Sequence, residues 1–133
     1  MAAADVEEPS AAGSRVLVVL IVEDEILIRM LLSEALRQEG YAVIEAANAD
    51  EAFLVLHASA DPDVLITDVR MPGTADGFAL AAYVRRTRPE LKVIITSGHA
   101  GPDGARGLAD AFLPKPYELA AILGRIRTLT APA

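Results

Sequence analysis

The chain has no cysteine among its 133 residues, no tryptophan, and few other aromatic residues. Without cysteine it can form no disulfide, no thiolate metal site and no cysteine nucleophile, which is consistent with a reducing compartment. Long apolar runs are also missing. The strongest, Val16–Val22, has about a third of the ~20 residues that a membrane-spanning helix needs. We therefore expect a cytoplasmic protein with no membrane-spanning segment.

Positive charge is scarce as well, because 12 lysine and arginine residues stand against 19 acidic residues and the net charge is −7. Such a chain repels nucleic-acid phosphates and anionic lipid headgroups, so we expect no direct binding to nucleic acid or membrane. Residues 1–14 lack the basic start and apolar stretch of a secretory signal, and we interpret them as a flexible tail.

The length and the apolar content predict one packed domain. Apolar residues make up 53% of the chain and charged residues 23%, which is typical of a folded soluble protein rather than a disordered one. We place the domain at residues 15–130, between the N-terminal tail (1–14) and a short C-terminal tail (131–133).

Five short, mostly apolar runs alternate with longer segments of helical period. This alternation predicts an α/β fold, in which a parallel sheet has helices on both faces. Strands that are covered on both sides are apolar throughout, as most of these runs are. The predicted strands are Val16–Val22, Tyr41–Glu45, Val64–Thr67, Leu91–Thr96 and Ala111–Leu113.

The segments between the strands carry apolar stripes that predict helices packed on the sheet. Asn48 followed by Glu51 predicts a capping box at the start of the second helix, and Asp76 predicts a cap for a third helix from about Gly77 to Thr87. Exposed arginines are expected at positions 85 and 86 of this helix and at position 88 directly after it. The stripes of the first and last helices consist of Ile28, Leu31, Leu32, Ala35 and Leu36, and of Leu119, Ile122, Leu123 and Ile126.

The segment between Ser97 and Asp110 interrupts this regularity. It contains four glycines and one proline in 14 residues, which leaves little room for a stable helix. We expect a short, mobile fourth helix here.

Reactive side chains follow the strands at one edge of the predicted sheet. Singly, each has an ordinary explanation, since an acid after a strand often caps a helix and a loop lysine is usually solvated. In an open parallel sheet, however, the carboxyl ends of the strands meet at one edge, where ligands bind. The residues concerned are Glu23, Asp24, Asp68, Thr96, Ser97 and Lys115.

Four segments that contain these residues, VLVVLIVEDE, VLITDVRMPG, VIITSGH and FLPKPY, resemble the signature segments of response-regulator receiver domains in order and spacing. The resemblance covers roughly residues 16 to 129. It implies a flavodoxin-like, doubly wound five-stranded parallel sheet with strand order 2-1-3-4-5. It also implies a role in two-component signalling, as a domain that catalyses only its own phosphorylation and dephosphorylation.

The resemblance implies a role for each matching position. Asp68 corresponds to the phosphoacceptor, and a carboxylate is a suitable oxygen nucleophile. Lys115 would neutralise charge on the phosphoryl oxygens. The ligands of Mg2+ would be Asp24, Asp68, Glu23 and the backbone carbonyl of Arg70, a hard-oxygen set that suits this ion.

The resemblance further implies how phosphorylation is sensed. Thr96 would hydrogen-bond a phosphoryl oxygen, and Phe112 corresponds to the switch aromatic, with an ordinary core phenylalanine as the alternative. Ser97 would leave the path of attack open. Pro116 implies a cis peptide bond after Lys115 that turns the lysine inward. The glycine-rich segment between Thr96 and Phe112 is about one helical turn shorter than in typical receivers, so this coupling is expected to differ.

The partners implied are a histidine kinase or histidine phosphotransfer protein upstream and an unidentified protein downstream. In this family, the face built from the fourth helix, fifth strand and fifth helix is the usual place for target binding or homodimerisation. One alternative is a phosphatase of the haloacid-dehalogenase type, which also uses an aspartyl nucleophile but has a second acid where Arg70 stands. Another is a pseudo-receiver that binds partners without being phosphorylated.

Overall fold

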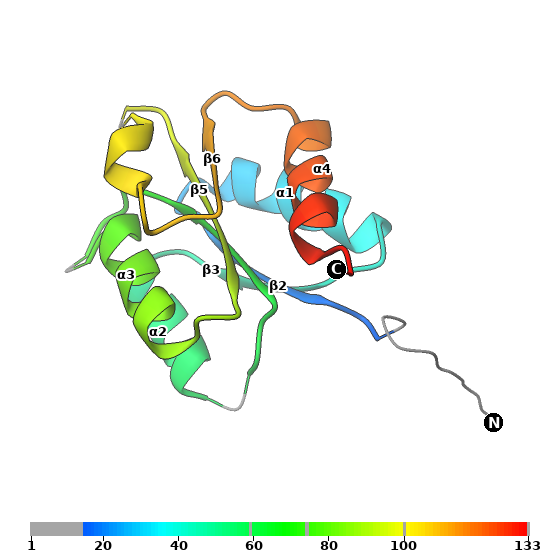
Figure 1. Cartoon of the computed structure of the whole chain (residues 1–133). Helices are drawn as coiled ribbons and strands as arrows, with labels where there is room; N and C mark the ends of the chain where they lie inside the picture. The colour runs from blue at the N-terminus through cyan, green and yellow to red at the C-terminus, as the bar shows by residue number, and fades with distance from the viewer. Residues whose placement is uncertain (1–14, 59, 74, 100, 133) are drawn as a thin grey trace.

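Five parallel strands form one sheet in the computed structural model, which describes residues 15–58, 60–73, 75–99 and 101–132. The strands are β2 (Val18–Val22), β3 (Ala42–Ala46), β4 (Val64–Asp68), β5 (Lys92–Ser97) and β6 (Ala111–Pro114). Their order across the sheet is β3-β2-β4-β5-β6 (Figure 1). Counted along the chain, β2 to β6 are the first to the fifth strand, so this order is the predicted 2-1-3-4-5. Each strand lies within two residues of its predicted bounds.

The helices α1 (Ile26–Gln38) and α4 (Leu119–Thr130) cover one face of the sheet, and α2 (Ala49–His57) and α3 (Gly77–Thr87) cover the other (Figure 1). Because side chains alternate along a strand, each central strand supplies both layers. Leu20 and Leu65 join the core beneath α2 and α3, whereas Ile21 and Ile66 join the core beneath α1 and α4.

Two helix starts are capped as predicted. The Asn48 Oδ1 atom accepts the Glu51 N–H at 2.8 Å, and the Glu51 carboxylate accepts the Ala47 N–H at 2.7 Å. At α3, the Asp76 Oδ1 atom accepts the Ala79 N–H at 2.9 Å. Such caps satisfy backbone donors that have no partner within the helix. No side chain caps the start of α1, where the residue before the first turn is Glu25.

Parts of the predicted helix faces are wrong. Leu31 was expected against the sheet, but it is 59% exposed, because the buried side of α1 is formed by Leu32, Ser33 and Leu36. Arg85 and Arg88 were expected to be exposed, but both are half-buried. Arg85 pairs with the Asp110 carboxylate at 2.9 Å, and Arg88 donates to the Leu56 carbonyl at 2.6 Å. Arg88 also pairs with the Asp61 carboxylate at 3.2 Å, so hydrogen bonds and ion pairs hold both arginine side chains against the protein.

The glycine-rich segment contains a four-residue 3-10 helix, η1 (Pro102–Ala105), in place of the short fourth helix that we expected. Ala105 is buried in the core beneath α2 and α3. Gly104 lies so close to Phe78 that a β-carbon on it would be 2.7 Å from the ring. The segment is therefore packed on the start of α3 at Gly104 and joins the core through Ala105. Ala100 lies outside the described residues.

No helix within the described ranges is both long enough and apolar enough to cross a membrane.

Candidate functional site

The parallel sheet brings the predicted site residues to its carboxyl edge. Asp68 is the last residue of β4 and pairs in register with Thr96 of β5. Glu23 and Asp24 directly follow β2, and Lys115 directly follows β6. The central strand β4 thus places Asp68 between the acid pair on one side and Thr96 on the other.

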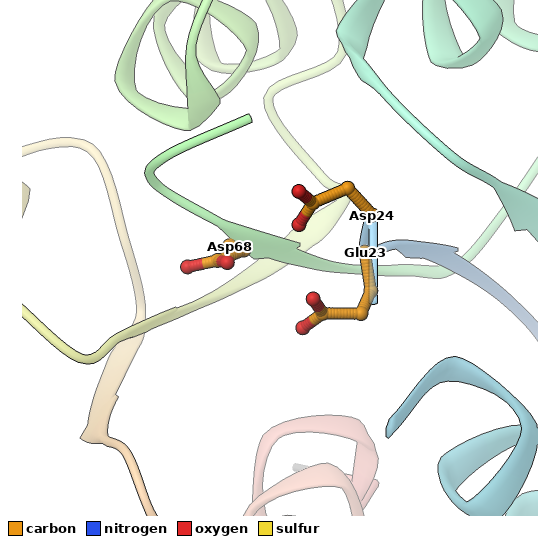
Figure 2. A group of neighbouring side chains, drawn as sticks. All are labelled: Glu23, Asp24 and Asp68. Atoms are coloured by element: carbon orange, nitrogen blue, oxygen red, sulfur yellow. The ribbon is translucent and has the colours of Figure 1, made fainter. Parts of the chain in front are cut away.

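The carboxylates of Glu23, Asp24 and Asp68 form one cluster. Each offers an oxygen atom, and these atoms all lie within 4.8 Å of one another. Figure 2 shows that the three carboxylates project to the same side of the sheet edge, two from the turn after β2 and one from the end of β4. Glu23 is 3% exposed and Asp68 is 8% exposed, whereas Asp24 is open to solvent.

Lys115 connects two of these acids. Its Nζ atom lies 2.7 Å from the Glu23 Oε1 atom and 3.0 Å from the Asp68 Oδ2 atom. Desolvation opposes the charged lysine, but the hydrogen bonds and charges of Glu23 and Asp68 outweigh it and raise the pKa of Lys115. For Glu23, desolvation disfavours the charged carboxylate by more than the hydrogen bond and the charge of Lys115 favour it, so the pKa of the carboxyl group is raised. Desolvation of the charged groups is therefore the largest unfavourable contribution to their ionisation at this site.

The orientation of the Asp68 side chain is fixed at both oxygens. Its Oδ1 atom accepts the Val69 N–H at 2.8 Å, while its Oδ2 atom accepts from Lys115. The Asp68 carbonyl oxygen accepts the Thr67 hydroxyl at 2.9 Å. A carboxylate held in this way presents a defined direction to an electrophile.

The remaining predicted residues lie around this centre. Thr96 and Ser97 are each 2% exposed at the end of β5. The Lys115 N–H donates to the Ser97 carbonyl at 2.8 Å, and the Lys115–Pro116 peptide bond is cis, as predicted. Phe112 is half-buried on β6 and packs against the core beneath α2 and α3.

A small cavity of about 220 Å³ opens onto Asp68. Arg70 lines this cavity and a second one, and Asp24 borders both. His99 also lines the cavity beside Asp68, and its backbone N–H donates to the Ser97 Oγ atom at 3.1 Å. Its place at the opening could not be inferred from a glycine-rich loop.

A larger, mainly apolar cavity of about 510 Å³ adjoins the site between α1 and the segment after β6. Ile28, Leu31 and Leu119 line it together with Lys115. Tyr117 also lines it, and burial, with the nearby Glu23 charge, raises the pKa of its hydroxyl group to about 12. The outer face of α1 continues this apolar surface with Ile26, Leu27 and Met30, which are 62%, 73% and 56% exposed.

Comparison with known proteins identifies the class to which this fold and site belong. The family model described as the response regulator receiver domain matches residues 19–127. The chain therefore belongs to the response-regulator receiver family, a signalling phosphoacceptor domain of two-component systems rather than a classical enzyme. This confirms the resemblance and argues against the phosphatase alternative.

Two curated relatives contain a matching segment. The chain is 43% identical over 106 residues to the sensor kinase CckA of Brucella abortus, an alignment that covers 76% of this chain and 11% of that protein. It is 38% identical over 107 residues to the DNA-binding transcriptional regulator NtrC of Salmonella typhimurium, covering 77% of this chain and 22% of that protein. The chain thus matches only a small part of either relative's length.

Solved structures share the fold. A CheY-like receiver domain protein from Methanospirillum hungatei superposes with a TM-score of 0.80 at 26% identity, covering 86% of this chain and 93% of that one. The response regulator TrrA from Thermotoga maritima, solved in complex with Mg2+ and beryllofluoride, superposes with a TM-score of 0.77 at 28% identity. That alignment covers 85% of this chain and 98% of that one.

Proposed function

We propose that Asp68 accepts a phosphoryl group from a histidine kinase or a histidine phosphotransfer protein, with Mg2+ bound at the acid cluster. The observation that carries this proposal is the fixed Asp68 carboxylate, which receives hydrogen bonds from Val69 and Lys115 beside Glu23 and Asp24. The domain that performs this reaction would extend over residues 15–130; of the two tails expected from the sequence, residues 1–14 and 133 lie outside the described residues.

In the transfer step, a carboxylate oxygen of Asp68 attacks the phosphorus atom of the donor's phosphohistidine. The new O–P bond forms as the N–P bond breaks, and the electron pair of that bond returns to the donor imidazole. The product is an acyl phosphate on Asp68. Because phosphoryl transfer depends on positioning and charge neutralisation, Lys115 contributes by holding a cation against the carboxylate that becomes phosphorylated.

The donor set fits Mg2+. Three carboxylates are clustered at the site and one ammonium group, that of Lys115, contacts two of them, so acidic groups outnumber the cation. Two of the acids are buried, and all the ligand atoms are hard oxygens. The protein ligands would be Glu23, Asp24, Asp68 and the backbone carbonyl of Arg70. When bound, the ion would offset charge on the phosphoryl oxygens.

Thr96 and Phe112 would report the modification. Thr96 is in register with Asp68, and Phe112 is in register with Ile95, the residue before Thr96. If the Thr96 hydroxyl bonds to a phosphoryl oxygen, the movement of Thr96 would therefore reach Ile95, the residue that lies beside Phe112 in the sheet. Ser97 keeps the path of attack open, and Pro116 holds the turn that follows Lys115.

Transfer from a protein donor requires a docking surface next to Asp68. The apolar cavity and the exposed face of α1 adjoin Lys115, so a helical phosphodonor domain would seat here with its histidine directed at the smaller cavity. Downstream, the phosphorylated state would bind a partner protein, or a second copy of the chain, through the face formed by η1, β6 and α4. Hydrolysis of the acyl phosphate by the domain itself would end the signal.

A direct test uses a small phosphodonor such as acetyl phosphate with Mg2+. We expect one acid-stable, base-labile phosphoryl group per chain, detected by intact mass, and its absence in Asp68→Asn. A chain that turns over external phosphomonoesters, or that is equally modified in Asp68→Asn, would contradict the proposal. In the wild type, phosphorylation should shift the NMR resonances of the Phe112 ring. Thr96→Val should still be phosphorylated, but its Phe112 resonances should not shift.

A further inference from the structure

Arg29 reaches back from the first turn of α1 to the turn that carries the acid pair. Its Nη1 atom donates to the backbone carbonyl oxygen of Glu23 at 2.8 Å. That carbonyl belongs to the peptide bond between Glu23 and Asp24. One hydrogen bond thus acts on the backbone unit from which two of the three clustered carboxylates project.

The Arg29 side chain is itself held in place. Its Nε atom donates to the Glu45 Oε1 atom of β3 at 3.2 Å, and only 18% of the side chain is exposed. Arg37 donates to the second carboxylate oxygen of Glu45 at 3.3 Å. A planar guanidinium group with two acceptors in different directions has little freedom to rotate. Arg29 therefore ties the turn after β2 to the edge strand β3.

At the helical side of this turn, the Glu25 N–H donates to the Glu23 Oε2 atom at 3.1 Å, which bonds the Glu23 side chain to the backbone two residues on. The starts of α2 and α3 are fixed by Asn48 and Asp76, but α1 has no side-chain cap. The backbone N–H of Glu23 donates to the Ala46 carbonyl at 3.1 Å, which fixes the peptide unit before Glu23, and the carbonyl of the peptide unit after it accepts from Arg29.

We propose that Arg29 is a positioning residue for the cation site: it orients the Glu23–Asp24 peptide so that both carboxylates face Asp68. The inference rests on the proposed function, because the cation in question is Mg2+. Arg29 acts through the backbone and does not touch the phosphoryl group. Residues that orient metal ligands in this way commonly account for about 10- to 100-fold in metal affinity.

The sign of the effect separates positioning from simple electrostatics. Arg29 is a cation next to a site for another cation, so its charge alone opposes Mg2+ binding. Removal of that charge would then tighten binding, whereas loss of positioning would weaken it. Arg37 provides a charge-matched control, because it pairs with the same Glu45 but lies eight residues further along the chain.

The experiment measures the Mg2+ dissociation constant of the full chain by calorimetry at fixed ionic strength. We expect Arg29→Gln to weaken binding by about tenfold, and Arg37→Gln to leave it unchanged or slightly tighter. Arg29→Lys keeps the charge without the two fixed donors, so its affinity should stay closer to that of Arg29→Gln than to the wild type. In metal-free protein, the Asp24 amide nitrogen resonance should move in Arg29→Gln and stay in place in Arg37→Gln.

Thermal melting in EDTA shows whether each variant is folded. If Arg29→Gln does not fold, Glu45→Ala decides the question, since it removes the acceptor that anchors the Arg29 Nε atom and should weaken Mg2+ binding in the same direction by a smaller factor. Unchanged or tighter binding in the folded variant would overturn the inference. A wild-type chain that binds no Mg2+ would instead refute the proposed function itself.

Discussion

Gly77 lies directly against the backbone of Asp68. A β-carbon at position 77 would be 2.0 Å from the Asp68 carbonyl oxygen and 2.8 Å from its carbonyl carbon. The Gly77 N–H also donates to the Val69 carbonyl at 2.8 Å. The start of α3 therefore packs on the residue that we propose as the phosphoacceptor, at a separation that only glycine allows.

Gly77→Ala should destabilise the fold and disturb the site together. The methyl group would meet rigid backbone atoms, so the junction between β4 and α3 must move, at a cost of about 1–3 kcal/mol. Urea denaturation would measure the loss, and the rate of phosphorylation by acetyl phosphate should fall as well. Gly124 of α4 has open space around its position, and Gly124→Ala should stabilise the chain by up to about 1 kcal/mol. Equal midpoints for the two variants would refute the argument.

Lys115→Met should slow phosphorylation while the fold persists. The substitution removes the cation that contacts Glu23 and Asp68, and loss of one such donor typically costs about 10²-fold in rate. Without Mg2+, two buried carboxylates would then lack their partner, so the melting temperature in EDTA should also fall. The chain has one other lysine, Lys92, at the opposite end of β5. Lys92→Met should leave the rate unchanged, and a similar loss in both variants would contradict the role of Lys115.

Asp110 should make folding sensitive to acid. Desolvation opposes its charge, but hydrogen bonds from the Val93 N–H at 2.8 Å and from Arg85 at 2.9 Å outweigh this and lower the pKa of the carboxyl group. A lowered pKa in the folded state means that the stabilisation is complete above the unfolded pKa of about 4 and is lost as pH falls through the folded value.

Asp110→Asn should therefore be less stable at pH 7, and its stability should decline less steeply between pH 4 and lower values. Urea midpoints measured across this range provide the test. Asp103→Asn is the control, because that carboxylate is 90% exposed on η1 and pairs with the similarly exposed Arg106 three residues away. An identical pH slope in Asp110→Asn and the wild type would refute the prediction.

The sequence predicted the strands and caps because their causes are local. A strand such as Val64–Asp68 is buried on both sides, and it is accordingly apolar up to its carboxyl end, where the polar residues of the site begin. Asn48 and Asp76 bond to donors three residues away. The exposure of Leu31 was not predictable in this way, because a helical stripe does not reveal which of two adjacent apolar faces meets the sheet.

The convergence of Asp68, Glu23 and Lys115 was predictable because the carboxyl ends of parallel strands meet at one edge. The supporting contacts were not. Arg29 binds a backbone carbonyl, which leaves no trace in residue type, and the contact between Gly77 and Asp68 depends on how β4 is joined to α3. The 3-10 helix at Pro102–Ala105 depends on packing against Phe78, a contact between residues far apart in the chain.

Leu27→Arg should impair phosphotransfer from a protein donor without affecting phosphorylation by acetyl phosphate. Leu27 is 73% exposed on α1, on the apolar face that adjoins the cavity next to Lys115. A small donor needs only the opening at Asp68, whereas a kinase or phosphotransfer domain must also bury this surface. An arginine at the centre of an apolar contact should slow transfer by about tenfold.

Leu54→Arg is the matched control for this prediction. Leu54 is 72% exposed, but it lies on α2, which covers the opposite face of the sheet. Any kinase found to phosphorylate the wild type by phosphotransfer profiling can serve as the donor. Slower transfer in Leu27→Arg alone, with equal rates from acetyl phosphate in all three proteins, would place the donor on α1. Equal transfer to both variants would mean that the donor approaches Asp68 without covering this helix, and the exposed leucines would then need another partner.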